Sequence, residues 1–234
     1  MRILLTGATG LVGQGVLRVC LDDPHVANVS VLGRRASGQL DAKLEELLVA
    51  DFGDLAPVED RLQPFDACLY CAGALPIGPE AEYRHITVDL TVHVARTFAT
   101  RNPAARFVYI SGAHSNPDSA IMPLKVKGEA EAALAALPIR TIMLRTGGVQ
   151  PVHGVRSPHP AMASLYTVAG PLMGLGLKLV PGLLTSTENV GMAMLQLLRM
   201  PDPPAIVEND AVNALADAYR AASGASSAED SPAP

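Results

Sequence analysis

The amino-acid sequence predicts an α/β protein with a doubly wound parallel sheet and a small C-terminal segment. Short apolar runs of strand length alternate with helical patterns along the first two thirds of the chain. Such alternation is typical of a parallel sheet that helices cover on both faces. A glycine-rich turn between the first strand pattern and the first helix pattern indicates the same fold. Right-handed crossovers then produce the doubly wound arrangement.

Each element follows from its own pattern. Six apolar runs predict the strands, at Arg2–Thr6, Asn28–Gly33, Glu46–Asp51, Asp66–Gly73, Ala105–Ser111 and Ile139–Arg145. Helical periodicity predicts three helices between them, at Leu11–Asp22, Glu80–Arg101 and Leu124–Leu137. The C-terminal part predicts a helix over Thr187–Met200 behind a Thr185–Glu188 capping box, a short strand over Ala205–Glu208, and a last helix from Asn209 to Ala222.

The expected organisation is one domain over residues 1–222, with a core at 1–149 and a C-terminal part at 150–222. Residues 223–234 are mainly Ser, Ala and Pro with acidic residues, which is typical of a disordered tail. A chain of 234 residues, 49% of them hydrophobic, can bury a core of its own without disulfides or metal ions.

Composition also narrows the class of partner. A net charge of −5 and an aromatic content of only 4% argue against a nucleic-acid-binding surface. The odd set of Cys20, Cys68 and Cys71 in apolar surroundings indicates a reducing compartment. Because Cys68 and Cys71 would face opposite sides of a strand, we expect neither a disulfide nor a metal site. No signal-peptide pattern follows Met1, so the expected location is the cytoplasm.

A glycine-rich turn runs from Thr6 to Gly13, between the first predicted strand and helix. Gly7 would make the tight turn, Gly10 would let the backbone approach a pyrophosphate, and Gly13 would let the helix pack closely. The free N–H groups at the helix start then face the anion. The alternative is a strand–helix turn without a ligand. The predicted cofactor-binding residues of this turn are Gly7, Thr9, Gly10, Leu11, Val12 and Gly13.

Two arginines, Arg34 and Arg35, follow the second predicted strand. A protein that binds NAD would be expected to have an Asp or Glu here for the ribose hydroxyls. Guanidinium groups instead suit a 2′-phosphate, both by charge and by bidentate geometry. The sequence therefore favours NADP as the cofactor. The alternative is that both arginines are solvated loop residues, with NAD as the cofactor.

The G-x-x-G-x-x-G spacing after Thr6 resembles that of the short-chain dehydrogenase superfamily, whose members have a Rossmann fold. Three stretches are similar to atypical members such as the Tat-interacting-protein-like oxidoreductases and the NAD-dependent epimerase/dehydratase-like proteins: 31–35, 127–131 and 206–209. The resemblance implies that Asp51 and Phe52 hold the adenine edge. It also implies that the turn formed by Cys71, Ala72 and Gly73 lies over the ribose. Residues 145–149 would then approach the nicotinamide.

The same resemblance implies a catalytic Ser, a Tyr, and a Lys four residues after the Tyr. Lys127 would be this Lys and would hold the nicotinamide ribose, although an exposed lysine paired with Glu131 is the alternative. Pro123 stands four residues before Lys127 and has no proton to transfer. Ser111 lies where relatives have a serine pair, but the usual catalytic serine aligns with Gly112. The residues present therefore do not support ordinary Ser–Tyr–Lys chemistry.

Other groups could replace the missing tyrosine. His114, just past the fifth predicted strand, is a candidate acid–base, although a plain loop histidine is the alternative. Tyr166, His153 or His159 could fold over the site from the C-terminal part. An acceptor that needs little proton assistance is a further alternative.

The stretch Ala161–Leu184 is apolar, with Lys178 as its sole charge. Glycines and prolines interrupt it, so we do not expect a transmembrane helix. It could line an apolar substrate pocket, dock on a subunit or a membrane surface, or pack on the sheet as core.

Three functions remain. The first is an NADP-dependent oxidoreductase of the atypical short-chain type that acts on a small apolar carbonyl compound. The second is a dinucleotide-binding sensor or scaffold without turnover, which the missing tyrosine favours. The third is a sugar-nucleotide epimerase or dehydratase, for which the C-terminal part is short.

Overall fold

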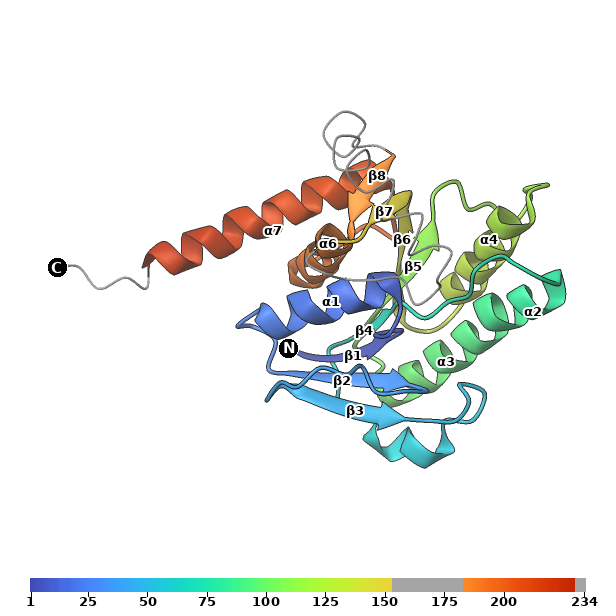
Figure 1. Ribbon diagram of the computed structural model, residues 1–234, viewed down its shortest axis with the longest axis horizontal. Helices are drawn as coiled ribbons and strands as arrows, with labels where there is room; N and C mark the ends of the chain where they lie inside the picture. Colours follow the sequence, from blue (N-terminus) through green and yellow to red (C-terminus); the bar gives the residue numbers. More distant parts are fainter. Residues whose placement is uncertain (153–182, 230–234) are drawn as a thin grey trace.

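The computed structural model describes residues 1–152 and 183–229, with side chains up to residue 223. Its centre is a seven-stranded sheet in the order β3-β2-β1-β4-β5-β6-β9, in which every neighbouring pair is parallel (Figure 1). The strands are β1 (Arg2–Thr6), β2 (Asn28–Gly33), β3 (Leu44–Leu48), β4 (Ala67–Tyr70), β5 (Arg106–Gly112), β6 (Arg140–Thr146) and β9 (Ile206–Val207). The predicted doubly wound α/β fold is confirmed.

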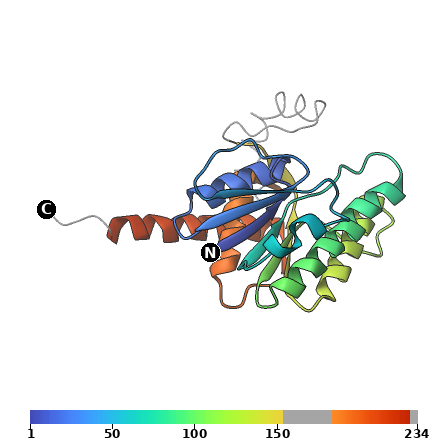
Figure 2. The same cartoon turned by 90° about the horizontal axis from the view of Figure 1, so that it is seen from below.

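Helices cover both faces of this sheet (Figure 2). On one face α1 (Leu11–Asp22) packs beside α6 (Thr187–Arg199), and α7 (Asn209–Glu229) packs on α6. On the other face lie α3 (Thr91–Arg101) and α4 (Met122–Ala135). The 3₁₀-helix η1 (Ala56–Arg61) follows β3 in the chain. Since ligands bind at the carboxyl ends of strands in such sheets, this end positions the candidate site.

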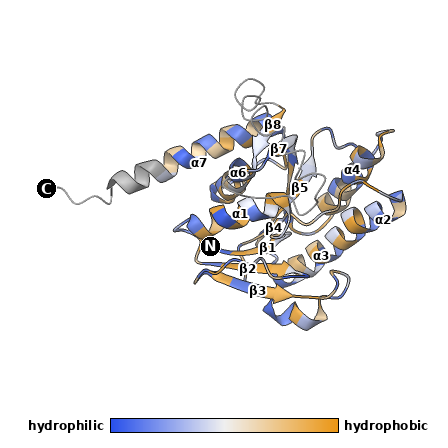
Figure 3. Cartoon of the chain, viewed as in Figure 1, coloured by the Kyte–Doolittle hydropathy of each residue, from blue (hydrophilic) through white to orange (hydrophobic). Residues whose placement is uncertain are grey.

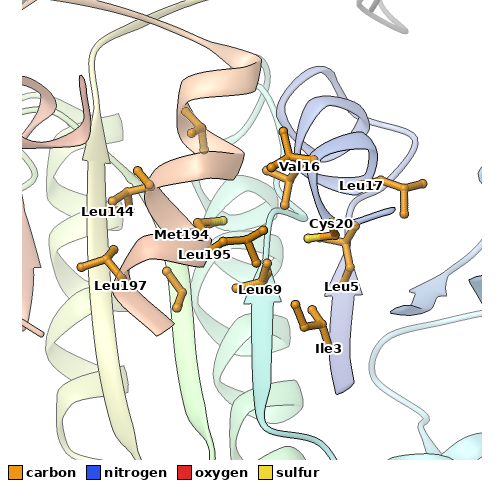
Figure 4. Close-up of a cluster of buried hydrophobic side chains, with 14 of the residues drawn as sticks. Ile3, Leu5, Val16, Leu17, Cys20, Leu69, Leu144, Met194, Leu195 and Leu197 are labelled. Atoms are coloured by element: carbon orange, nitrogen blue, oxygen red, sulfur yellow. The ribbon is translucent and has the colours of Figure 1, made fainter. Parts of the chain in front are cut away.

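The core forms two clusters, one on each side of the sheet, because successive strand residues point to opposite faces. Leu5 and Leu69 pack against Val16 of α1 and Met194 of α6 in the first cluster (Figure 4). Tyr70, Phe107 and Tyr109 belong to the second cluster, together with residues of α3 and α4. Hydrophobic residues run along the central strands (Figure 3), as burial on both faces of a parallel sheet requires.

Three predicted elements differ most from the structure: the third strand, the fourth strand, which ends at Tyr70 rather than at Gly73, and the long helix after it. The third strand lies at Leu44–Leu48 because it pairs with β2, and the pairing ends where β2 ends, at Gly33 opposite Leu48. The helix predicted over residues 80–101 is continuous but consists of α2 (Glu80–Arg84), the π-helical segment η2 (His85–Leu90) and α3.

The two C-terminal helices begin at the predicted residues, Thr187 and Asn209, but their capping and their C-terminal ends differ from the prediction. The N-cap of α6 is Ser186, whose Oγ accepts from the N–H of Asn189 at 3.0 Å, so the predicted Thr185–Glu188 capping box is wrong. Thr185 instead donates to Asn213 at 2.8 Å. The last helix continues past Ala222 to Glu229, into the predicted disordered tail, because alanine-rich sequence favours the helix.

A second, two-stranded sheet was not predicted. It joins β7 (Gly148–Gln150) to β8 (Leu184–Ser186) in parallel. A Cβ atom at Gly147 would lie 2.3 Å from the carbonyl oxygen of Leu183, so the two chain segments approach closely only because position 147 is a glycine.

Residues 161–182 of the predicted apolar stretch lie outside the part of the chain that the structure describes. The three alternative acid–base groups, Tyr166, His153 and His159, lie outside it too. Among the helices that the structure describes, none is long and apolar enough to cross a membrane.

A buried carboxylate joins the first helix to the last two. The side chain of Asp23 is fully buried and lies 2.6 Å from Nη2 of Arg199. It also accepts from the hydroxyl of Tyr219 at 2.9 Å and from the N–H of His25 at 2.7 Å. These contacts hold α1, α6 and α7 together on one face of the sheet.

Candidate functional site

A pocket of about 450 Å³ lies at the carboxyl ends of β1, β2 and β4. This is the sheet edge at which doubly wound folds bind ligands. Eleven predicted cofactor residues line it: Gly7, Thr9, Gly10, Leu11, Val12, Arg34, Arg35, Phe52, Cys71, Ala72 and Gly73. The remaining lining residues are Ala8, Val31, Gly33, Ala74 and Leu75.

The turn after β1 is shaped by its glycines. Gly7 has a φ of +72°, and a Cβ atom there would lie 2.5 Å from the backbone of both Cys71 and Ala72. A Cβ atom at Gly13 would lie only 2.0 Å from the carbonyl oxygen of Gly7. Gly13 is therefore buried behind the turn and does not line the pocket. Any side chain at either position would push the turn out of shape.

The first helix opens onto this pocket at its N-terminus. Its N-cap is Gly10, which provides no side chain to bond the first N–H groups, and its first turn contains no acidic residue. Leu11 and Val12 of that turn line the pocket. Unsatisfied N–H groups and the helix dipole make such an end attractive to an anion.

Arg34 and Arg35 add positive charge on the β2 side. Both side chains are exposed. Among the described residues, neither guanidinium forms an ion pair, and no Asp or Glu lines the pocket. Asp51 lies outside the lining and accepts from the N–H of Gly53 at 2.8 Å, so the structure brings only Phe52 of the predicted adenine pair to the pocket.

The turn after β4, formed by residues 71–73, completes the lining of the pocket. The N–H of Ala72 donates to Oγ1 of Thr6 at 3.2 Å, which fastens this turn to the end of β1. Cys71 is a free cysteine, and burial raises the pKa of its thiol well above the usual value. The described residues contain no cluster of His, Cys, Asp or Glu that could hold a metal ion.

A pair of buried serines lies farther along the same sheet edge, at the end of β5. Ser115 donates to the carbonyl oxygen of Gly112 at 2.7 Å, and its Oγ lies 3.1 Å from Oγ of Ser111. Since the Ser115 proton is used, Ser111 must be the donor of that pair. Sequence reasoning named Ser111 and missed Ser115, whose only signal is its place four residues later.

His114 lies in the same turn but is exposed, outside the pocket lining. Its φ of +62° is unusual for a residue other than glycine. The structure therefore does not bring this histidine into the pocket that the glycine-rich turn forms.

Lys127 reaches from α4 to the end of β5. Its Nζ donates to the carbonyl oxygen of Ile110 at 3.2 Å and lies 5.2 Å from the centre of the Tyr109 ring. Burial lowers the pKa of Lys127 to about 8. Glu131, the partner that an exposed lysine would have, bonds to Arg145 instead. Lys127 does not line the pocket.

The parallel sheet, the glycine-rich turn and the pocket together define a dinucleotide-binding protein of the Rossmann type. Residues 3–136, more than half of the chain, match the model of the "NAD dependent epimerase/dehydratase family". The chain belongs to this family. Binding of an NAD(P) dinucleotide follows from that membership.

Several curated relatives are fungal proteins. "Protein fmp52, mitochondrial" of Aspergillus fumigatus is 31% identical over 72% of this chain and 74% of its own length. "Protein FMP52, mitochondrial" of Saccharomyces cerevisiae is 29% identical over 67% of this chain and 68% of its own. "Leucinostatins biosynthesis cluster protein T" of Purpureocillium lilacinum is 29% identical over 64% of this chain, which spans only 58% of that protein.

Solved structures show the same fold at low identity. The enzyme WbmG of Bordetella bronchiseptica in complex with NAD is 18% identical and has a TM-score of 0.64, covering 97% of this chain and 79% of its own. UDP-glucuronic acid 4-epimerase of Bacillus cereus in complex with NAD is 15% identical with a TM-score of 0.65, covering 89% and 76%.

The expected cytoplasmic location is contradicted by the sequence relatives. Several of them, including those of Aspergillus fumigatus, Meyerozyma guilliermondii and Saccharomyces cerevisiae, are named mitochondrial proteins. The expectation was drawn from cysteine content and from the start of the chain. Reduced cysteines are a property of more than one compartment, so the cysteine content does not single out the cytoplasm.

Proposed function

We propose that this chain is an NADP(H)-dependent oxidoreductase that acts on a small apolar carbonyl compound. One observation carries the choice of cofactor: a helix N-terminus and two unpaired arginines converge on a pocket whose described lining contains no carboxylate. A carboxylate at the end of β2 would bind the ribose hydroxyls of NAD and repel a 2′-phosphate. Guanidinium groups at the same place attract that phosphate.

The residues fit a dinucleotide because Gly7 and Gly13, where a Cβ atom would clash with neighbouring backbone, keep the turn in a shape that presents the N-terminus of α1 to the pocket. The first turn of α1 would hold the diphosphate, Arg34 and Arg35 the 2′-phosphate, Phe52 the adenine edge, and the turn at 71–73 the ribose. When bound, the dinucleotide supplies two-electron oxidation or reduction at a carbonyl or alcohol carbon. We assign the nicotinamide end to the edge where β5 and β6 finish.

Exposed apolar residues around that edge support an apolar substrate. Ile77 follows β4 and is 78% exposed, and Ile121 follows β5 and is 61% exposed. Leu183 contacts the backbone beside Gly147, after β6, and is 60% exposed. Large hydrophobic side chains exposed around a ligand-binding edge favour an apolar ligand.

The test is a calorimetric titration of the whole chain with NADPH and with NADH. Replacing both Arg34 and Arg35 by alanine is expected to weaken NADPH binding about 10–100-fold, because exposed guanidinium–phosphate contacts contribute about 1–3 kcal/mol. NADH binding should change less than about threefold. Arg18→Ala with Arg96→Ala removes the same charge from exposed helix positions away from the pocket and serves as the control. Equal losses for both cofactors would contradict the 2′-phosphate assignment.

A second function, dinucleotide binding without turnover, is favoured by Pro123 at the position where the resemblance places a tyrosine. Incubation of the chain with NADPH and a panel of apolar aldehydes, ketones and quinones separates the two. Steady oxidation of NADPH with any of them supports the oxidoreductase. Tight NADPH binding without oxidation across the panel supports the binding protein.

A further inference from the structure

The buried carboxylate of Glu131, one helical turn after Lys127, pairs with Arg145 and not with Lys127. Glu131 follows Lys127 by four positions on α4, the spacing at which a Lys–Glu pair usually forms. Its side chain is only 8% exposed, and it bonds Arg145 of β6 through both oxygens. Nε of Arg145 lies 3.0 and 3.2 Å from the two oxygens, and Nη2 lies 2.6 Å from Oε2. Such a bidentate pair is among the strongest ionic contacts in proteins.

Arg145 is itself fixed on a second side. Its Nη1 donates to Oε1 of Glu208, next to β9, at 2.9 Å. The guanidinium is therefore held between α4 and the end of the sheet, and its side chain is only 18% exposed. A guanidinium held by two carboxylates has little freedom to release Glu131.

The amine of Lys127 has a different environment. It donates to the carbonyl oxygen of Ile110 and lies over the ring of Tyr109. The carbon chain of Lys127 passes Gly112, where a Cβ atom would lie 3.2 Å from its Cδ. Within the ranges that the structure describes, no carboxylate lies at ion-pair distance from Nζ.

We propose that Arg145 is a positioning residue: by holding both oxygens of Glu131, it leaves the Lys127 amine without a carboxylate partner at the carboxyl edge of the sheet. The assignment rests on the proposed function, because it gives that site a group able to exchange a proton where Pro123 cannot. The ammonium form gives a proton to a substrate oxygen, and the amine then recovers one from water.

The electrostatic environment agrees with this role. Burial lowers the pKa of Lys127 to about 8, and the charge of Glu131 opposes that shift. Of the ionisable groups on the elements packed against α4, Tyr109 of β5 and Tyr83 of α2 have raised pKa values, Arg84 of α2 pairs with Glu129, and His85 and Asp89 of η2 pair with each other at the surface. Lys125 is a second cation on α4 itself. An amine with these neighbours changes its charge near physiological pH.

The experiment measures the pKa of Lys127 in the whole chain without dinucleotide, from the pH dependence of competitive acetylation read by mass spectrometry. The expected value for the wild type is about 8. Arg145→Met should release Glu131 to pair with Lys127 and lower the reactivity of the amine at pH 8 by at least about tenfold. Adding Glu131→Gln to that variant should restore the wild-type reactivity. Arg140→Met, which removes an arginine from the other end of β6, should have no effect.

Two results would overturn the proposal. One is a wild-type pKa at or above the usual lysine value, since Lys127 would then be paired already. The other is an unchanged reactivity in folded Arg145→Met. If that variant does not fold, Glu131→Gln alone decides: unchanged reactivity supports the proposal, and a more than tenfold increase at pH 8 overturns it. A wild-type value near 8 without NADPH oxidation would overturn the proposed function alone.

Discussion

Replacing Gly7 by alanine is expected to disrupt the pocket and the fold together, whereas the same replacement at Gly38 should cost much less. Both glycines have positive φ, +72° at Gly7 and +77° at Gly38. They differ in their surroundings. A Cβ atom at Gly7 would lie 2.5 Å from the backbone of Cys71 and of Ala72, whereas at Gly38 it would have no neighbour within 4 Å. The comparison separates steric overlap from backbone strain.

The magnitude follows from these two terms. An alanine in the left-handed region costs about 1–2 kcal/mol at either position. Overlap with backbone atoms that cannot move aside adds about 1–3 kcal/mol at Gly7. We therefore expect the free energy of unfolding to fall by about 2–5 kcal/mol in Gly7→Ala and by about 1–2 kcal/mol in Gly38→Ala. Relief of the overlap would separate the turns after β1 and β4 and misplace the N–H groups of α1.

Urea unfolding followed by circular dichroism measures the stability, and calorimetry measures the dissociation constant for NADPH. Gly7→Ala should weaken binding by at least about tenfold, which corresponds to about 1.4 kcal/mol. Gly38→Ala should bind as the wild type does. Equal destabilisation of the two variants, or unchanged NADPH binding in folded Gly7→Ala, would refute the reasoning from steric overlap.

Two further predictions concern buried charges. Asp23→Ala should lower the free energy of unfolding by about 3–5 kcal/mol, because it leaves Arg199 and Tyr219 without their buried partner. Asp22 is exposed, so Asp22→Ala should change the free energy of unfolding by less than about 0.5 kcal/mol. Equal effects of the two substitutions in urea unfolding would contradict this prediction. Lys127 has a folded pKa of about 8, below its unfolded value of 10.5. The unfolded chain thus binds more protons between these values, and stability should rise with pH through this window by about 1–3 kcal/mol relative to Lys127→Met. Parallel stability curves for the two proteins would exclude a perturbed Lys127.

The sequence predicted the elements with strong local signals and the part of the site that they carry. β1, α1 and β2 begin and end where expected, because an apolar run, a glycine turn and an amphipathic helix follow one another without a gap. The same stretch provides half of the pocket lining.

Features that depend on distant contacts were predicted less well. The ends of β3 depend on its pairing with β2, which the third strand alone does not reveal. Helical spacing offered Glu131 as a partner for Lys127, but Glu131 pairs instead with Arg145, fourteen residues after Glu131 in the chain. Ser115 joins Ser111 only because the turn after β5 folds back on itself.

The location of α6 has a consequence for synthesis of the chain on the ribosome. Arg199 bonds Asp23 across 176 residues, so the α1 side of the sheet stays incomplete until α6 has emerged. At a translation rate of about 5–20 residues per second, Val16 and Leu5 would stay uncovered on the order of ten seconds or more before Met194 is made. The nascent chain therefore exposes an apolar face on the α1 side until α6 is made, whereas α3 and α4 can already cover the opposite face.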